Sequence, residues 1–196
     1  RIAQINRLKT EEVELLPLQR EAYNRVLKEF RVKRTANPLE LITRLREICD
    51  YHEDTEQSSK IDRTLEIIAE VRTLGEKVVI FSYLLRPLEI ISRRLRQSFP
   101  EGARIFEAIT GNMEIRERNA AIARFKDDSQ KTTLLCSSRI GGEGLNLTEA
   151  NHVIFLNEWW NPAANAQARD RVHRIGQEKG VRVYRFRCAW TIEQTL

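Results

Sequence analysis

The first third of the chain carries apolar residues at helical spacing. They recur every three or four positions between residues 18 and 30 and again between residues 41 and 49, a period that predicts two amphipathic helices. Asn37 and Pro38 suit the N-cap and the first position of the second helix, because asparagine accepts a backbone N–H and proline lacks one. We therefore expect the first third of the chain to be helical.

A polar, acidic stretch at residues 51–59 separates these helices from the rest of the chain. We expect a loop there, with Ser59 capping a third helix that Gly75 ends. This loop is the candidate domain boundary. The chain would then consist of a helical protrusion and linker, residues 1–59, followed by a second domain, residues 60–196.

After Gly75 the pattern changes to short apolar runs separated by amphipathic segments of helical length. Such runs indicate strands buried on both faces, and helical crossovers between them indicate a parallel sheet. The expected fold class is α/β, with helices on both faces of the sheet. The five runs are residues 78–81, 104–109, 133–136, 153–156 and 181–186.

The composition is typical of a folded, basic protein. Hydrophobic residues make up 41% of the 196 positions, and 33 Lys and Arg against 28 Asp and Glu give a formal net charge of +5. That charge favours a polyanionic partner, although many basic domains bind no nucleic acid. No apolar run approaches the ~18 residues of a membrane span and no signal-like core is present, so we expect an intracellular protein without a membrane partner.

The cysteines are Cys49, Cys136 and Cys188, far apart and without a Cys-x-x-Cys pair. They support neither a disulfide framework nor a zinc knuckle, and a reducing compartment fits them. Cys49 and His52 have the spacing of metal ligands, but no second ligand pair follows. A buried thiol beside a loop histidine is the better explanation, and no metal ligand is assigned.

Small hydroxyl and glycine residues follow three of the predicted strands. Ser82 follows the first, Thr110 and Gly111 follow the second, and Ser138 and Arg139 follow the third. Ligands of parallel sheets bind at the carboxyl ends of the strands, and small residues there let backbone N–H groups approach phosphates. Turn chemistry explains any one of these loops, but three of them on one sheet edge indicate a binding surface.

The spacing of residues 167–177 predicts a helix that would place Gln167, Arg171 and Arg174 on one stripe, because residues three or four apart are neighbours on a helix. The planar, permanently charged guanidinium matches phosphate oxygens and neutralises charge on a transferring phosphoryl group. The alternative is a solvated helix face on which Asp170 pairs with neighbouring arginines. The order of the motifs upstream favours the phosphate site.

Two motifs are missing from the sequence. No Gly-x-x-x-x-Gly-Lys-Ser/Thr loop occurs, and no acidic pair follows a strand to hold magnesium, so the chain cannot by itself hold a nucleoside triphosphate. No Gly-x-Gly-x-x-Gly follows the first strand, which argues against a dinucleotide-dependent enzyme. We expect the chain to be a piece of something larger that contributes part of a nucleotide site.

Five motifs, in order, resemble those of the second RecA-like lobe of Swi/Snf-type ATPases, a branch of the superfamily-two helicases. They are residues 77–82, 110–111 with 118–125, 137–147, 160–162 and 167–177. RNA helicases of the DEAD-box kind normally carry glycine where Asp170 and His173 stand, so the resemblance favours the double-stranded DNA branch. The sequence departs from the family at Thr110, at Ile140 and at residues 50–52, where Asp, Ala and Asn-His-Pro are common.

The resemblance implies a role for each matching residue. Arg171 and Arg174 would be catalytic arginine fingers for ATP, bound with Mg²⁺ mainly on a first lobe that this chain lacks. The residues expected beside the nucleotide are Gln167, Gly142, Gly144 and Asn146. The residues expected near the DNA backbone are Ser82, Thr110, Gly111, Ser138 and Arg139.

The implied function is that of a motor lobe in an ATP-driven translocase on double-stranded DNA, which remodels protein–DNA complexes without separating the strands. Its partners would be double-stranded DNA, the N-terminal RecA-like lobe of the same polypeptide and a displaced DNA-bound protein. The isolated lobe is expected to be inactive. Two alternatives remain: an unwinding helicase or restriction-type motor, and a nucleic-acid- or protein-binding module that no longer hydrolyses nucleotide.

Overall fold

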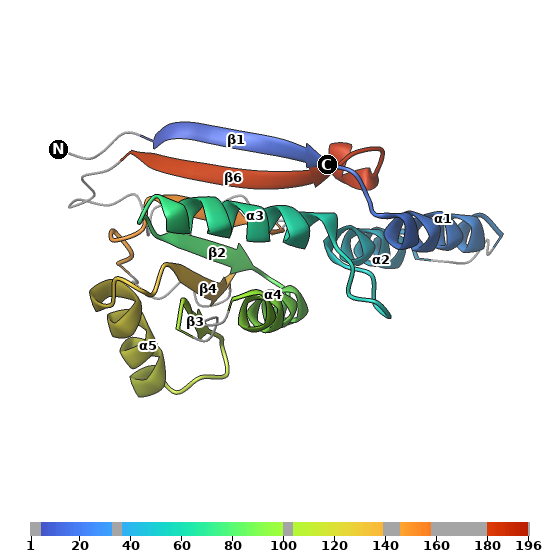
Figure 1. Ribbon diagram of the computed structural model, residues 1–196. Coiled ribbons are helices and arrows are strands. Elements are labelled where there is room, and N and C mark those ends of the chain that lie inside the picture. The colour runs from blue at the N-terminus through green and yellow to red at the C-terminus, as the bar shows by residue number, and fades with distance from the viewer. Residues whose placement is uncertain (1–4, 33–36, 100–103, 139–145, 158–179, 196) are drawn as a thin grey trace. The chain divides into compact units, whose positions relative to one another are not determined.

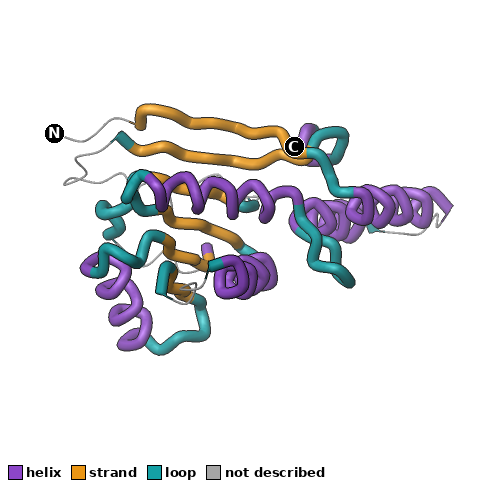
Figure 2. The backbone as a smooth tube through the Cα atoms, in the orientation of Figure 1, coloured by secondary structure: helices purple, strands orange, loops and turns teal. Residues whose placement is uncertain are grey.

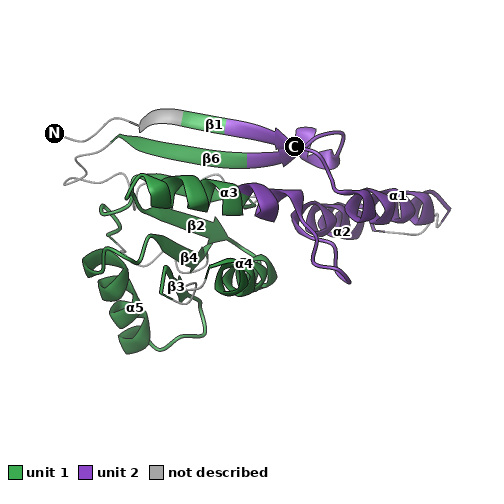
Figure 3. Ribbon diagram, viewed as in Figure 1, with its two compact units in different colours: residues 1–9, 64–185 green, residues 10–63, 186–196 purple. Residues whose placement is uncertain are grey.

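The computed structural model describes residues 5–32, 37–99, 104–138, 146–157 and 180–195 (Figure 1). The chain forms two compact units (Figure 3). The first unit comprises residues 1–9 and 64–185, and the second comprises residues 10–63 and 186–196. The predicted domain limits at residues 59 and 60 stay a prediction, because compactness within one chain does not test independent folding.

A six-stranded sheet has the strand order β1-β6-β5-β2-β4-β3. Its strands are drawn in orange in Figure 2. The pairings β2–β4, β2–β5, β3–β4 and β5–β6 are all parallel, so the predicted α/β fold with a parallel sheet is confirmed. The strands are β1 (Ile5–Val13), β2 (Val78–Ser82), β3 (Phe106–Ile109), β4 (Thr133–Ser137), β5 (His152–Phe155) and β6 (Val181–Cys188).

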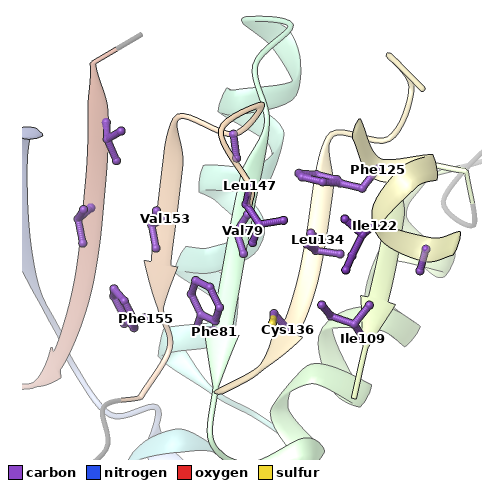
Figure 4. Packing of buried hydrophobic residues seen from close by; sticks show 14 residues of the cluster. Val79, Phe81, Ile109, Ile122, Phe125, Leu134, Cys136, Leu147, Val153 and Phe155 are labelled. Atoms are coloured by element: carbon purple, nitrogen blue, oxygen red, sulfur yellow. The ribbon is translucent and has the colours of Figure 1, made fainter. Parts of the chain in front are cut away.

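The central strands are buried on both faces, which explains their nearly continuous apolar sequences. Every residue of β2, β4 and β5 is buried. Because successive side chains of a strand point to opposite faces, Val79 and Phe81 pack together on one face with Ile122 and Phe125 of α5 (Ile115–Asp127). Helix α4 (Leu85–Ser98) contacts β2 and β4, and it lies with α3 behind the sheet when α5 is in front (Figure 4).

The second unit contains the predicted helices α1 (Pro17–Val32) and α2 (Pro38–Asp50) and the first residues of α3 (Ser59–Thr73). Asn37 caps α2 as predicted, accepting from the backbone N–H of Leu39 at 3.0 Å. The predicted cap of α3 is wrong by one residue, since the hydroxyl of Ser58 accepts from the backbone N–H of Ile61 at 3.1 Å. A short 3-10 helix, η2 (Ile192–Gln194), follows β6.

The prediction that the first third of the chain is wholly helical is wrong for β1. Its residues carry no helical apolar period, and their backbone lies beside β6 in the sheet. At its end, the carbonyl oxygen of Val13 accepts from the backbone N–H of Ala189 at 2.8 Å. The pairing partner of β1 is more than 160 residues away along the chain. Local periodicity therefore could not predict that β1 is a strand.

A buried ion cluster stabilises the second unit. The ammonium of Lys60 lies 2.8 Å from Asp50 Oδ1 and 2.6 Å from Glu193 Oε1. Burial alone would lower the pKa of Lys60, but the two carboxylates outweigh it and raise this pKa well above its ordinary value. The cluster therefore holds a charged lysine in the interior, where only paired charges are tolerated.

Candidate functional site

The register of the sheet aligns the ends of three strands at its carboxyl edge. Ser82 of β2 lies opposite Ser137 of β4. Ile109 of β3 lies opposite Cys136, the residue before Ser137, so Thr110 continues the same row. Neighbouring strands are about 4.8 Å apart, and the loops after β2, β3 and β4 therefore form one continuous edge, as the sequence predicted.

Ser82 uses its hydroxyl within its own turn. The hydroxyl donates to the carbonyl oxygen of Leu84 at 2.7 Å and accepts from the backbone N–H of Leu84 at 3.2 Å, and the residue is buried. A serine that bonds backbone two residues ahead stabilises a turn. The predicted contact of Ser82 with DNA stays a prediction. Because the Ser82 hydroxyl is used within the turn, the backbone of the turn is a better candidate for contact with DNA than the hydroxyl.

Thr110 and Gly111 lie in the turn between β3 and α5. Thr110 is partly exposed and Gly111 is exposed. The backbone carbonyl of Thr110 accepts from the N–H of Met113 at 3.2 Å, which closes the turn. A Cβ placed on Gly111 would meet no atom within 4 Å, so neither crowding nor a left-handed backbone requires glycine there in the described part of the chain.

Two more predicted residues are described by the structure. Ser138 follows β4 directly and is partly exposed, and Asn146 is exposed beside the buried Leu147. The remaining predicted residues lie outside the described parts of the chain, so their geometry stays a prediction. They are Arg139, Gly142, Gly144, Gln167, Arg171 and Arg174.

Helices α4 and α5 both begin at this edge without a side-chain cap. Leu84 and Glu114 hold the N-cap positions, and neither side chain accepts a bond from its helix. The first N–H groups of a helix have no intrahelical partner, and they carry the positive end of the helix dipole. The start of α4 has no acidic residue in its first turn and is suited to anions such as phosphate, whereas Glu114 and Glu117 make the start of α5 acidic.

Asn157 was missed by the sequence reasoning. It is 4% exposed, and its Oδ1 accepts from the backbone N–H of Tyr83 at 2.9 Å. It therefore joins the turn after β5 to the turn after β2. The available signal was a polar residue immediately after a buried strand, at the edge where such sheets bind ligands.

The thiol cluster of the second unit is poorly suited to a metal ion. Cys49 Sγ, Cys188 Sγ and a carboxylate oxygen of Glu193 lie within 4.8 Å of one another. Glu193 already binds the Lys60 ammonium and accepts from the backbone N–H of Cys188 at 2.9 Å. Two causes raise the pKa of Cys188: a hydrogen bond with Cys49, which is the larger, and burial. A protonated thiol next to a buried ammonium disfavours a cation.

His52 does not take part in this thiol cluster. Its Nδ1 accepts from the backbone N–H of Thr55 at 3.3 Å, a contact within its own loop. The cysteine and histidine whose sequence spacing resembled a ligand pair are thus engaged with different partners. Among the described residues, no helix has the length and apolar character needed to cross a bilayer.

The parallel sheet with crossover helices is an α/β fold, and its structural neighbours identify it as RecA-like. Residues 59–176 match the helicase conserved C-terminal domain, and the chain belongs to that family. The C-terminal part of the Fun30 ATPase domain has the same fold, with a TM-score of 0.84 at 20% identity over 100% of this chain and 89% of that chain.

A second solved structure adds a ligand to the comparison. The Sulfolobus solfataricus SWI2/SNF2 ATPase core in complex with dsDNA aligns with a TM-score of 0.77 at 27% identity, over 95% of this chain and 42% of that chain. The chain is therefore a C-terminal RecA-like lobe of the Swi2/Snf2 type.

Curated relatives point to the same family. The putative ATP-dependent helicase/translocase YwqA of Bacillus subtilis is 34% identical over 209 residues, covering 96% of this chain and 22% of the relative. The DNA repair protein RAD5 of Eremothecium gossypii is 36% identical over 149 residues, covering 74% of this chain and 14% of the relative. The chain thus spans less than a quarter of the length of these relatives. The names of the relatives mark the family as one of ATP-dependent enzymes.

Proposed function

We propose that the chain is the C-terminal motor lobe of an ATP-driven translocase that moves along double-stranded DNA and remodels protein–DNA complexes. The observation that carries this proposal is the common row of strand ends at β2, β4 and β3. It occurs in a lobe whose fold matches a Swi2/Snf2 core in complex with dsDNA. Lobes of this kind work in pairs, so the N-terminal lobe of the same polypeptide is the expected partner.

The DNA backbone would lie along the carboxyl edge of the sheet. This edge offers hydroxyl groups, backbone N–H groups and the start of α4, which has neither a side-chain cap nor an acidic first turn, all of which suit phosphate oxygens. Such contacts carry no sequence information, so binding is expected to tolerate any duplex sequence. The proposed contacts are the turn at Ser82 together with Thr110, Gly111, Ser138 and Arg139.

The nucleotide would be shared between the two lobes. The first lobe would hold ATP and Mg²⁺, while Arg171 and Arg174 would stabilise the charge that develops on the transferring phosphoryl group. The residues proposed beside the nucleotide are Gln167, Gly142, Gly144 and Asn146. ATP bound between the lobes would close them and hydrolysis would open them, which would move the lobes along DNA.

The catalytic part of this proposal is tested in the full-length protein. Arg171→Ala and Arg174→Ala should each lower maximal ATP turnover ~10³-fold or more, as for other arginine fingers, with ATP binding nearly unchanged. Arg169→Ala is the matched control, because helical spacing would put Arg169 off the stripe expected for Gln167, Arg171 and Arg174. A variant that lost nucleotide affinity but kept its maximal rate would assign that arginine to ground-state binding instead.

The DNA part is tested by titrating the full-length protein with two unrelated duplexes over a series of salt concentrations. Arg139→Ala should weaken binding equally for both duplexes and reduce the slope of log affinity against log salt by about one contact. Gly111→Ala should leave the fold intact, since the space around Gly111 is open, and should still weaken DNA binding. A loss confined to one duplex would place the DNA elsewhere on the lobe.

A further inference from the structure

Two turns at the carboxyl edge of the sheet are joined by a double connection. The backbone N–H of Leu156 donates to the carbonyl oxygen of Phe81 at 3.0 Å, which extends the pairing of β5 with β2 by one step. Beyond that step, Asn157 Oδ1 accepts from the backbone N–H of Tyr83 at 2.9 Å. A side chain thus continues the connection where the strands end.

The bond from Asn157 acts on a turn that Ser82 also stabilises from within. Ser82 donates to and accepts from the backbone of Leu84, so the hydroxyl of Ser82 stabilises the turn from within. Asn157 ties the same turn to the end of β5. Together the two side chains hold the backbone that leads into the uncapped start of α4.

We propose that Asn157 is a positioning residue that orders the turn between β2 and α4 in advance of DNA binding. This inference rests on the proposed function, because the turn is one of the proposed contacts with the DNA backbone. A loop that is already ordered binds its ligand more tightly, since less conformational freedom is lost on binding. Without the acceptor at Asn157, DNA would have to order the turn, and its affinity would fall.

The burial of Asn157 supports a dedicated role for its amide. With 4% of its surface exposed, the side chain is largely removed from water, and a buried amide is tolerated when it is hydrogen-bonded. An apolar side chain of similar size would fill the same space and leave the Tyr83 N–H without this acceptor. Asn157→Leu therefore keeps the branching and the number of heavy atoms of the side chain while it removes the hydrogen bond.

The experiment measures the ATP turnover of the full-length protein at saturating ATP as a function of duplex DNA concentration. Asn157→Leu should raise the half-saturating DNA concentration about tenfold, which corresponds to ~1.4 kcal/mol, while the rate at saturating DNA is kept. Asn157→Ala also removes the acceptor but adds no bulk, so it should raise the half-saturating DNA concentration to a similar extent, which separates the lost hydrogen bond from any effect of side-chain volume.

Asn151 provides the matched control. It is also 4% exposed, and it lies at the amino end of β5, where its backbone N–H donates to the carbonyl oxygen of Lys77 at 3.2 Å. Asn151→Leu should leave the half-saturating DNA concentration unchanged. Thermal unfolding of every variant reports any loss of folded protein, which lowers the rate at saturation without changing the half-saturating concentration.

Two results would overturn the inference. One is a half-saturating DNA concentration for Asn157→Leu equal to that of wild type, and the other is a wild-type value for Asn157→Ala. A wild-type protein whose ATP turnover does not respond to DNA would instead refute the proposed function itself. The two failures are therefore distinguishable in the same set of titrations.

Discussion

Replacing Lys60 by methionine should destabilise the second unit strongly. Lys60 is completely buried and lies between Asp50, which is 1% exposed, and Glu193, which is 12% exposed. Methionine has a similar length but no charge, so the change leaves two largely buried carboxylates without their ammonium. Removing one partner of a buried ion pair typically lowers the free energy of unfolding by about 3–5 kcal/mol, a large part of the ~5–15 kcal/mol that stabilises a typical domain.

The measurement is denaturant-induced unfolding at neutral pH, followed by circular dichroism. Arg124→Met is the control, because Arg124 is half-exposed and pairs with Glu107 at 2.9 Å; exposed pairs contribute only ~0–1 kcal/mol. Neutralising the cluster as a whole, with Asn in place of Asp50 and Gln in place of Glu193 as well, should recover part of the loss, because no buried charge then remains.

The pH dependence gives an independent test of the same reasoning. The pKa of Lys60 in the folded protein is raised above the ordinary value of 10.5, so its stabilising effect is fully present below that value and is lost as the pH rises through the folded pKa. Lys60 therefore stays protonated between pH 7 and 9. Its titration should not alter the difference in unfolding free energy between wild type and Lys60→Met over that range. A loss smaller than ~1 kcal/mol at neutral pH, the range of a surface pair, would refute the assignment of a buried ion cluster.

Three further predictions follow from the site and the buried groups. The isolated chain should show no DNA-stimulated ATP hydrolysis in a phosphate-release assay, because it lacks the motifs that hold the triphosphate and magnesium; detectable turnover would contradict the shared nucleotide site. Burial alone would raise the pKa of Glu107, but hydrogen bonds from Arg124 and Lys131 outweigh it and lower this pKa below 4.5. The ionised Glu107 therefore stabilises the fold above pH 4.5, and this stabilisation is lost as the pH falls through the lowered pKa. Thermal unfolding of Glu107→Gln should therefore differ from wild type at pH 6 and converge with it in acid, and a constant difference would be inconsistent with this assignment. All three cysteines are buried, and burial raises the pKa of Cys136 to about 12, so iodoacetamide at pH 8 should label the native chain far more slowly than the unfolded chain, as mass spectrometry would report.

The sequence by itself determined the elements whose signals are local. The apolar runs predicted β2, β4 and β5, because strands buried on both faces need hydrophobic residues throughout. Asn37 and Pro38 predicted the start of α2, since capping involves residues only two or three positions apart. The small residues after the strands predicted the loop edge, because parallel strands bring their carboxyl ends to one side of a sheet.

Only the tertiary structure decided the features whose partners are distant in sequence. β1 is a strand because it pairs with β6 in the sheet, although the apolar residues of its own sequence have no clear period. Lys60 and Glu193 are 133 positions apart, and Tyr83 and Asn157 are 74 positions apart. Local periodicity reports which face of an element is apolar, but not which polar groups meet across the fold. The buried ion cluster and the connection at Asn157 therefore emerged only when the chain was folded.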